Sequence, residues 1–395
     1  MDLSIDTVTL EGFRSYSTFE LSDIGPLTIL VGPNAAGKTN IIEAIQLLTS
    51  LSSFRNATTQ QLVAWGQPQA RIEAWEKSTS RDLKVSLNIS EEKKEYQVNG
   101  KKKRPKDIRG ILPSVIFSPD DLHLAKGPHS IRRAAVDAIG TQLNANYHTI
   151  KKDYERLIRH KNYLLKEEQP PAVLQSVNDI LAVIGTQLQC YRYALFQKLA
   201  PLIQEHYQGI AGSSETLACS YTPFWKEGST SSSSGTADSS ADSSANDLAD
   251  TLPDLDRTEV QARFAASFKK KEAEERQRRQ ACTGPHTDRV GFSINGSDAG
   301  IYGSQGQQRS LVLAFKLAEL AAIQDIAHQK PVLLLDDVMS ELDSTRRSAL
   351  LRYVSDDIQT FITTTTLDYF PKEAMQDASV VTLPSKQAQG GGKAP

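Results

Sequence analysis

The sequence contains few cysteines and no long apolar run. Its three cysteines, Cys190, Cys219 and Cys282, form no CxxC pair. An odd number of widely spaced cysteines argues against a disulfide framework and against a zinc site. No apolar run approaches the roughly 18 residues needed to span a bilayer, and the N-terminal residues show no basic segment followed by an apolar one. We therefore expect reduced thiols and a cytoplasmic location.

The sequence also lacks an excess of charge of one sign. Its formal net charge of −2 gives no global attraction to nucleic acid, so any such binding must come from local basic patches. Of its 395 residues, 39% are apolar and 23% are charged, as in an ordinary globular protein. The length allows two or three domains with a sizeable core.

Strand and helix patterns are unevenly distributed along the chain. Residues 3–31 alternate as strands do, with LTILV at 27–31 the clearest buried strand, and a helix pattern follows from Asn40 to Leu51. Further short strands are predicted at 71–75, 83–89 and 95–98, and VNGKK favours a hairpin turn that leads into a basic loop. The N-terminal part of the chain therefore predicts mixed strands and helices.

The middle of the chain has a helical pattern instead. Residues 130–166 and 172–208 predict long helices separated by Pro170-Pro171, and helix resumes near Asp256. The Ser-rich stretch 228–250 has too few apolar residues to offset its ordering entropy, so it predicts disorder. After Cys282 strands and helices return, and the tail at 386–395 is expected to be frayed. The pattern therefore predicts mixed strands and helices at 1–125 and 281–385, on either side of a mainly α-helical stretch at 126–280.

The segment GPNAAGKT, residues 32–39, matches the phosphate-loop pattern GxxxxGK[ST] between a buried strand and a helix. Backbone amides of such a loop surround a phosphate, Lys38 supplies a positive charge to it, and the Thr39 hydroxyl can bind Mg²⁺. A Gly-rich turn without ligand is the alternative. The predicted phosphate-binding residues are Gly32, Pro33, Asn34, Ala35, Ala36, Gly37, Lys38, Thr39 and Asn40.

A second site is predicted where PVLLLDD ends in two carboxylates, Asp336 and Asp337. The period of two in a strand would send these side chains to opposite sides. One of the two carboxylates could then meet Mg²⁺, while the other would face an attacking water. An exposed acidic turn after a core strand is the alternative.

These motifs, in this order, resemble the ABC-type ATPase heads of chromosome-maintenance and repair proteins. Within that group the chain is similar to the RecF family, through LEGFRSY, GKTNIIEAI, SSFR, FSPDDLHLAKGPHSIRRAAVD, GPHTD, SQGQQRSL and LLLDDVMSELD. The resemblance implies an α/β head with an inserted helical arm, bound ATP and Mg²⁺, and slow hydrolysis stimulated by DNA. It also implies a homodimer that forms with ATP on gapped or junction DNA, a RecR partner, and roles in recombinase loading and the SOS response.

The resemblance gives a role to the signature segment before the apolar helix at 309–320. It implies that this segment faces the nucleotide of a second subunit, where its donors would be satisfied only in the ATP-bound dimer. The alternative is an ordinary helix cap formed by Ser304. The residues concerned are Ser304, Gln305, Gly306, Gln307 and Gln308.

The chain departs from the family pattern at two positions and leaves the γ-phosphate sensors unidentified. Ala35 stands where such loops usually have Gly, and Asp337 stands where most ABC-type ATPases have Glu, which predicts slow hydrolysis. No switch His follows FITTTT and no Gln stands out at 114–121. Other classes remain as alternatives, namely a motor or transporter subunit and, less favoured because [NT]KxD is missing, a GTPase.

Three basic segments are candidates for DNA contact, namely 100–109, 150–166 and 268–279. Each offers several cations that could displace counterions from phosphates, and none suggests readout of bases. Solvated helix faces are the alternative, above all for 268–279, where Glu272, Glu274 and Glu275 offset the charge.

Overall fold

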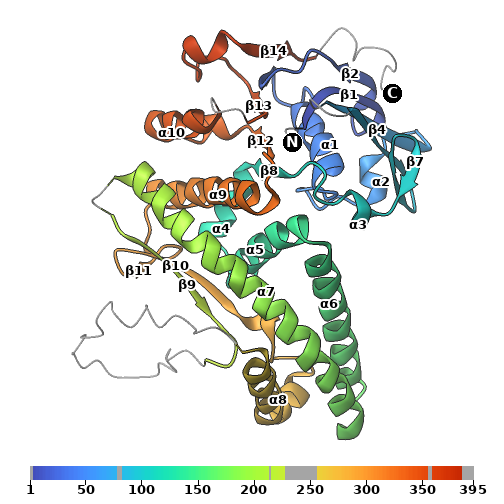
Figure 1. The fold of residues 1–395 in the computed structure, drawn as a ribbon, viewed down its shortest axis with the longest axis vertical. Helices are drawn as coiled ribbons and strands as arrows, with labels where there is room; N and C mark the ends of the chain where they lie inside the picture. Colours follow the sequence, from blue (N-terminus) through green and yellow to red (C-terminus); the bar gives the residue numbers. More distant parts are fainter. Residues whose placement is uncertain (1–2, 78–81, 213–214, 227–255, 355–357, 385–395) are drawn as a thin grey trace. The chain divides into compact units, whose positions relative to one another are not determined.

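The computed structural model describes residues 3–77, 82–212, 215–226, 256–354 and 358–384 (Figure 1). The stretch predicted to be disordered, 228–250, and the tail at 386–395 lie outside these residues. Within the described part, no helix is long and apolar enough to cross a membrane, and the three cysteines are free thiols. The chain divides into two compact units, Met1–Leu122 with Arg309–Pro395, and His123–Gln308.

The first unit contains a six-stranded antiparallel sheet. Its strands alternate buried and exposed residues because one face packs on the core. Asn99 and Gly100 both adopt positive φ, 49° and 74°, which is the geometry of a tight hairpin, so the turn predicted at VNGKK is confirmed. The prediction that a basic loop follows directly is wrong, because Lys101–Lys103 form a paired strand. In spatial order the strands are β2 (Tyr16–Leu21), β1 (Ser4–Phe13), β4 (Gln69–Lys77), β5 (Asp82–Ser90), β6 (Lys94–Val98) and β7 (Lys101–Lys103).

A five-stranded parallel sheet forms the second layer of this unit. Helix α1 (Lys38–Thr49) contacts strands of both sheets, and its apolar residues on every side are buried in one core with theirs. Parallel pairing matches Val31 with Thr364 and Asp336 with Thr363, so the ends of three strands meet at one edge of the sheet. The strand order is β14 (Ala378–Thr382), β3 (Leu27–Val31), β13 (Thr360–Thr364), β12 (Val332–Asp336) and β8 (Ser114–Phe117).

The remaining helices of the first unit are short, apart from α9 and α10. Helix α9 is buried through most of its length from Leu311 onward, which explains its apolar residues on every face. These helices are α2 (Thr59–Leu62), α3 (Pro105–Ile108), α9 (Gln305–Ala327, which begins in the second unit) and α10 (Ser344–Val354). Single 3-10 turns lie at Pro119–Leu122, Val338–Ser340 and Glu373–Met375.

The second unit is mainly helical. In Figure 1 the long helix α7 lies against α6 and α8, and Tyr154, Leu181 and Phe264 belong to their shared core. A three-stranded antiparallel sheet, ordered β11-β10-β9, packs on α7. The elements are α4 (His123–Lys126), α5 (His129–Leu143), α6 (Ala145–Lys166), α7 (Pro171–Ala211), β9 (Leu217–Thr222), α8 (Arg257–Arg278), a 3-10 turn at Pro285–Thr287, β10 (Arg289–Ile294) and β11 (Ser297–Asp298).

The single helix predicted at 130–166 is wrong, because the chain breaks it at Asn144. This residue has the extended backbone of an N-cap, and its side chain accepts hydrogen bonds from the backbone N–H groups of Asn146 and Tyr147. The second compact unit also extends to Gln308, beyond the predicted boundary at 280/281, because β10 pairs along its length with β9. The fold class is the predicted one: an α/β head from both chain ends with a mainly helical insertion.

Candidate nucleotide-binding site

The loop between β3 and α1 has the backbone geometry of a phosphate loop. Gly37 caps α1 with φ of 96°, and a Cβ there would lie 2.4 Å from the Tyr16 hydroxyl oxygen. A Cβ on Gly32 would lie 2.3 Å from the Leu383 carbonyl oxygen. Ala35 has φ of 66°, so it adopts the left-handed conformation for which Gly is better suited. The departure at Ala35 therefore leaves the loop shape intact.

Lys38 reaches back over this loop. Its Nζ donates hydrogen bonds to the carbonyl oxygens of Gly32, at 2.7 Å, and Pro33, at 2.9 Å. Burial lowers the pKa of Lys38, while the charges of Asp337 and Asp336 act in the opposite direction. The two hydrogen bonds hold the Lys38 ammonium group at the loop. A phosphate bound there would contact both the ammonium group and the loop amides.

Asp336 ends β12 next to Thr39. The Thr39 hydroxyl donates to Asp336 Oδ1 at 2.9 Å, and the Thr363 hydroxyl donates to the same oxygen at 2.8 Å. Burial raises the pKa of Asp336, and these two hydrogen bonds partly offset that effect. A carboxylate is costly to bury without a cation, so the arrangement favours one here.

These oxygen atoms fit Mg²⁺. A hydroxyl and a carboxylate oxygen 2.9 Å apart are hard ligands that can share one ion. The described residues contain no group of three or more His, Cys, Asp or Glu that could hold a metal. Mg²⁺ at Thr39 and Asp336 would therefore take its other ligands from phosphate and water, as it commonly does.

Asp337 does not continue the strand. The strand ends at Asp336, and Asp337 has φ of 53°, so the expected alternation of the two carboxylates does not extend to it. Its backbone N–H donates to the Thr363 hydroxyl at 2.9 Å. Burial raises the pKa of Asp337, and the charge of Lys38 counteracts this. Its Oδ1 is buried without a hydrogen-bond partner in the described structure, which leaves an acceptor for a water molecule.

Residues of LEGFRSY and SSFR meet on α1. Arg14 donates two hydrogen bonds to the fully buried Glu43 carboxylate, at 2.8 and 2.7 Å, and the Ser53 hydroxyl donates to it at 2.5 Å. Arg55 donates to the Asn40 side-chain oxygen at 3.0 Å. These contacts fix the first turns of α1, and so they orient the helix whose N-terminus faces the loop.

The signature segment is partly satisfied within the chain. Ser304 and Gln307 cap the helix reciprocally, because the Gln307 N–H donates to Ser304 Oγ and the Ser304 N–H donates to Gln307 Oε1. The Gln307 amide also donates to Glu215, and the Gln308 amide donates to the carbonyl oxygens of Ala299 and Gly300. The expectation that these donors are satisfied only in a dimer is therefore wrong for Gln307 and Gln308.

Two members of the signature remain available to a partner. Ser304 and Gln305 are exposed, and Gly306 is partly exposed. The capping alternative describes one role of Ser304, whose hydroxyl accepts from Gln307 and can still donate elsewhere.

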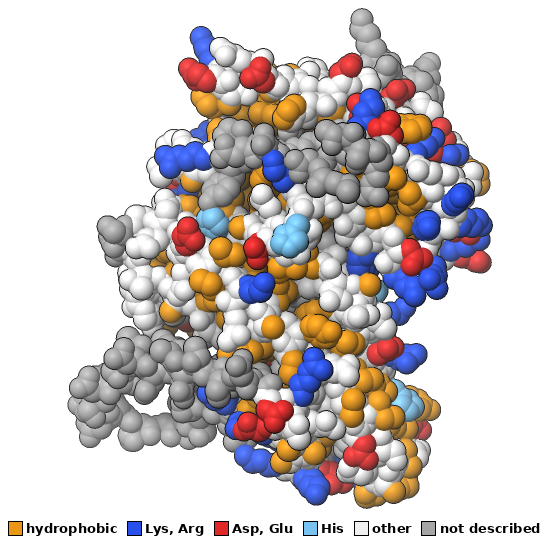
Figure 2. Space-filling view, in the orientation of Figure 1, with side chains coloured by type: hydrophobic (Ala, Val, Ile, Leu, Met, Phe, Trp, Pro, Cys, Tyr) orange, Lys and Arg blue, Asp and Glu red, His pale blue; other side chains and the backbone are white. Residues whose placement is uncertain are grey.

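The basic segments differ in how far their charges are neutralised. Segment 268–279 lies on α8, where Lys271, Arg276 and Arg278 pair with glutamates one turn away. In segment 100–109, β7 is an exposed edge strand, and Lys102 and Arg104 pair weakly at the surface with Glu95 and Asp107. Figure 2 shows Lys and Arg side chains gathered over the part of the first unit where β7 and α3 lie. The interpretation as a solvated face thus suits 268–279 better than 100–109.

Comparisons with known proteins agree with this geometry. The family described as RecF/RecN/SMC N terminal domain matches residues 4–388. The DNA replication and repair protein RecF of Synechococcus sp. (strain JA-3-3Ab) is 36% identical over 94% of this chain and 93% of its own. The chain belongs to the RecF family. RecF of Halalkalibacterium halodurans is also similar, at 32% identity over 96% of this chain and 97% of its own.

Solved structures show the same relation. A structure described as the recombination mediator protein RecF-ATPrS in the RecFOR pathway has a TM-score of 0.81 and 26% identity, and it covers 94% of each chain. The Smc head domain of Pyrococcus furiosus shares the fold, with a TM-score of 0.51 and 14% identity over 96% of this chain. This member of the RecF family therefore has the head fold of ABC-type ATPases.

Sequence reasoning missed Thr363. Its one hydroxyl links the Asp336 carboxylate to the backbone N–H of Asp337, although Thr363 is 27 residues from Asp336 in sequence. The only signal was the threonine run FITTTT, which by itself assigns no role to any one of its hydroxyls. The role of Thr363 depends on β13 lying between β3 and β12, and single-sequence patterns do not reveal strand order.

Proposed function

We propose that this chain binds ATP with Mg²⁺ and hydrolyses it slowly. The observation that carries the proposal is the convergence of three groups at one sheet edge: the loop with Lys38, the Thr39–Asp336 pair and the Asp337 carboxylate. Lys38 and the loop amides would hold the phosphates. Mg²⁺ at Thr39 and Asp336 would supply charge stabilisation when bound.

Asp337 would then act as the residue that orients and deprotonates water. A general base needs an acceptor that the protein has not already used, and Asp337 Oδ1 has no hydrogen-bond partner in the described structure. Asp is one methylene shorter than the Glu of most ABC-type ATPases, so it would hold the water less closely. Slow turnover follows from this difference.

ATP is proposed to join two copies of the chain. Ile301 and Tyr302 are 74% and 73% exposed and are separated from Ser304 only by Gly303, so they would add apolar contact area to an interface formed by Ser304 and Gln305. In a two-fold dimer, Ser304 and Gln305 of one copy would contact the γ-phosphate held by the loop of the other. The γ-phosphate would then be the group that joins the two heads.

The biological role is proposed from the family. RecF proteins are described as DNA replication and repair proteins, and one relative is described as a recombination mediator in the RecFOR pathway. We infer that this chain forms its ATP-dependent homodimer on gapped or junction DNA, assists recombinase loading and SOS induction, and works with RecR. Such a protein would act in the cytoplasm, at the nucleoid.

The test measures nucleotide turnover with and without gapped DNA, using ATP and GTP in parallel. We expect slow hydrolysis of ATP that DNA stimulates and much weaker hydrolysis of GTP. Lys38→Met should reduce nucleotide binding, because the charge opposite the phosphates is lost. A preference for GTP would favour the GTPase alternative, and turnover indifferent to DNA would favour a motor or transporter subunit.

A further inference from the structure

Two sequence motifs in the second unit take no part in the proposed ATP chemistry. HSIRRAAVD lies on α5 and GPHTD precedes β10, and their side chains meet around Arg192 of α7. Arg192 donates to both carboxylate oxygens of Asp137, at 2.8 and 3.0 Å, and to the Pro285 carbonyl oxygen at 2.6 Å. Asp288, fully buried, lies 3.4 Å from the same guanidinium. Arg192 is thus paired with Asp137 and lies close to Asp288, so the carboxylates of the two motifs share one buried cation.

A cavity of about 310 Å³ lies over this network, between α5 and α6. From α5 it is lined by residues of one helix face, including Ser130 and Arg133, and from α6 by Lys151 and Arg159. Its lining residues include four cations, with Arg192 as the fourth, and two carboxylates, Asp137 and Glu155. The formal charge of the lining is therefore +2, that is, 4 − 2, when His286 is neutral.

Not all cations of this cavity are paired with acidic groups of the chain. Asp137 is committed to Arg192, and Lys151 pairs with Glu155 at 2.6 Å in a partly exposed i,i+4 contact of the weak kind. Arg159 is exposed and has no acidic partner in the described part of the chain. Arg133 donates one hydrogen bond to the Asp288 carbonyl oxygen, which leaves other N–H groups of its guanidinium available. An anion would thus meet Arg133, Lys151 and Arg159 together.

The N-terminus of helix α5 adds to the positive electrostatic potential of the cavity. It begins at His129 after Pro128, no side chain caps it, and its first turn contains no acidic residue. Ser130, in that first turn, lines the cavity. An uncapped helix start carries free backbone N–H groups and a partial positive charge, which favour an anion nearby.

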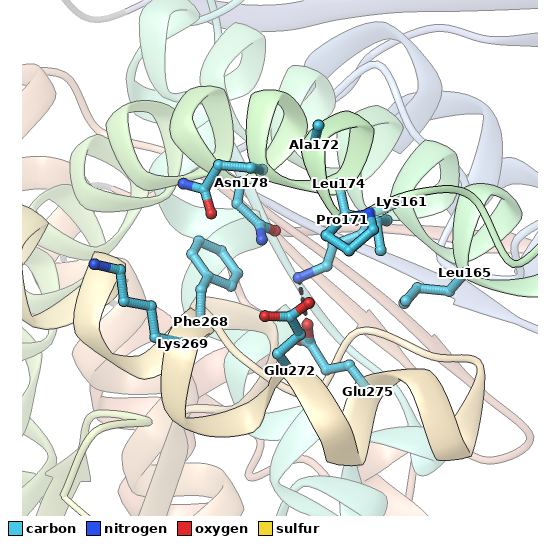
Figure 3. A pocket seen from close by; sticks show the side chains of 11 residues that line it. Lys161, Leu165, Pro171, Ala172, Leu174, Asn178, Phe268, Lys269, Glu272 and Glu275 are labelled. Atoms are coloured by element: carbon cyan, nitrogen blue, oxygen red, sulfur yellow. Dashed lines mark ion pairs between the residues drawn. The ribbon is translucent and has the colours of Figure 1, made fainter.

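A second cavity of the same unit has a lining with equal numbers of cations and carboxylates (Figure 3). It measures about 280 Å³, and its lining contains Lys161 and Lys269 against Glu272 and Glu275. Lys161 is 1% exposed and lies 2.6 Å from Glu275 and 4.1 Å from the centre of the Phe268 ring. Its cation is used to hold α6 against α8, and the lining has no net charge. This cavity is therefore a matched control.

We propose that the cavity between α5 and α6 is a phosphate-binding site that takes one backbone phosphate of bound DNA. Arg133 and Arg159 present planar guanidinium groups suited to phosphate oxygens, and Lys151 adds a point charge. A cation that contacts a backbone phosphate positions DNA without selecting its sequence. The inference rests on the proposed function, because it names DNA as the source of the phosphate.

The test compares three proteins: wild type, a double variant that carries both Lys151→Gln and Arg159→Gln, and the control variant Lys269→Gln. Each binds gapped DNA in the presence of ATP and Mg²⁺ at several salt concentrations. We expect the slope of log K against log salt to flatten by up to about 2 in the double variant, near one for each cation that no longer neutralises a phosphate. The control should keep the wild-type slope. Thermal melting checks that the exposed substitutions leave folding unchanged.

Three results would overturn parts of the account separately. A wild-type slope in the double variant contradicts this inference and leaves the proposed function standing. No salt-dependent DNA binding by the wild type contradicts the proposed DNA function itself. In a parallel titration with inorganic phosphate, binding that the double variant loses while its DNA slope stays unchanged assigns the site to free phosphate and refutes the DNA contact.

Discussion

Thr363→Val removes the hydroxyl that links the Asp336 carboxylate to the backbone N–H of Asp337. Thr363 is 1% exposed, donates to Asp336 at 2.8 Å and accepts from the Asp337 N–H at 2.9 Å. Valine has nearly the same shape and neither donor nor acceptor. The substitution therefore leaves the partly buried N–H of Asp337 without its partner and takes one hydrogen bond from the carboxylate proposed to bind Mg²⁺.

The expected loss in the free energy of unfolding follows from those two hydrogen bonds. A hydrogen bond to a charged group contributes about 1.5 to 3 kcal/mol, and an unsatisfied buried donor costs about 1 to 3 kcal/mol. We expect the free energy of unfolding to fall by about 2 to 4 kcal/mol, since some relaxation will offset the sum. Loss of a hydrogen bond that orients a metal ligand typically reduces metal affinity or activity by about 10- to 100-fold. ATP binding without Mg²⁺ should change little, because Lys38 and the loop are untouched.

The assay measures ATP turnover as a function of Mg²⁺ concentration, with Thr363→Ser as the matched control. Serine keeps the hydroxyl, so it should retain most of the wild-type Mg²⁺ dependence. Thr363→Val should require more Mg²⁺ for half-maximal turnover. If the valine variant folds and shows the wild-type Mg²⁺ dependence, Thr363 does not position the metal ligand and the reasoning fails.

Three further substitutions test other parts of the account. Asp337→Asn should keep ATP affinity and slow hydrolysis by at least about tenfold, within the usual range of general-base effects; unchanged turnover would remove that role. Ala35→Gly should raise the free energy of unfolding in urea by up to about 1 kcal/mol, because relief of the left-handed alanine exceeds the added chain entropy, and a decrease would contradict this. Burial lowers the pKa of His286 to about 4 from its ordinary 6.5, so the unfolded chain gains a proton first and stability falls between pH 6.5 and pH 4, by at most about 3 kcal/mol. Asp288, whose pKa burial raises to about 6, acts in the opposite direction between pH 6 and its ordinary 3.8. His286→Gln should therefore lose less stability on acidification than wild type, as measured by unfolding at each pH, and an equal loss would argue against a neutral buried His286.

The sequence could predict those parts of the site that are contiguous in the chain. The phosphate loop and the carboxylates Asp336 and Asp337 each follow a buried strand, and both features are visible in a short window. The strand and helix character of the head follows for the same reason, because hydrophobic period is a local property.

Other features depend on contacts distant in sequence. Thr363 acquires its role through the pairing of β13 with β12. The Gln307 amide is satisfied by Glu215, 92 residues away, which no periodicity indicates. The break at Asn144 is local, but capping by its side chain competes with a helix pattern that continues on both sides. The left-handed backbone of Asp337 ends the strand at Asp336, whereas the sequence pattern predicts that the strand includes both carboxylates.

The central claim is that ATP joins two heads through the exposed signature residues. Sedimentation of wild type and Ser304→Arg, each with ATP and Mg²⁺, tests it most directly, and Lys38→Met serves as the control for nucleotide binding. Ser304→Arg places a bulky side chain at an exposed position of the proposed contact, so the variant should bind ATP as a monomer, fail to dimerise and fail to hydrolyse ATP. Mixing it with Lys38→Met should restore at most one composite site, with an intact loop from one copy and an intact signature from the other. A Ser304→Arg protein that dimerises with ATP as wild type does would contradict the claim.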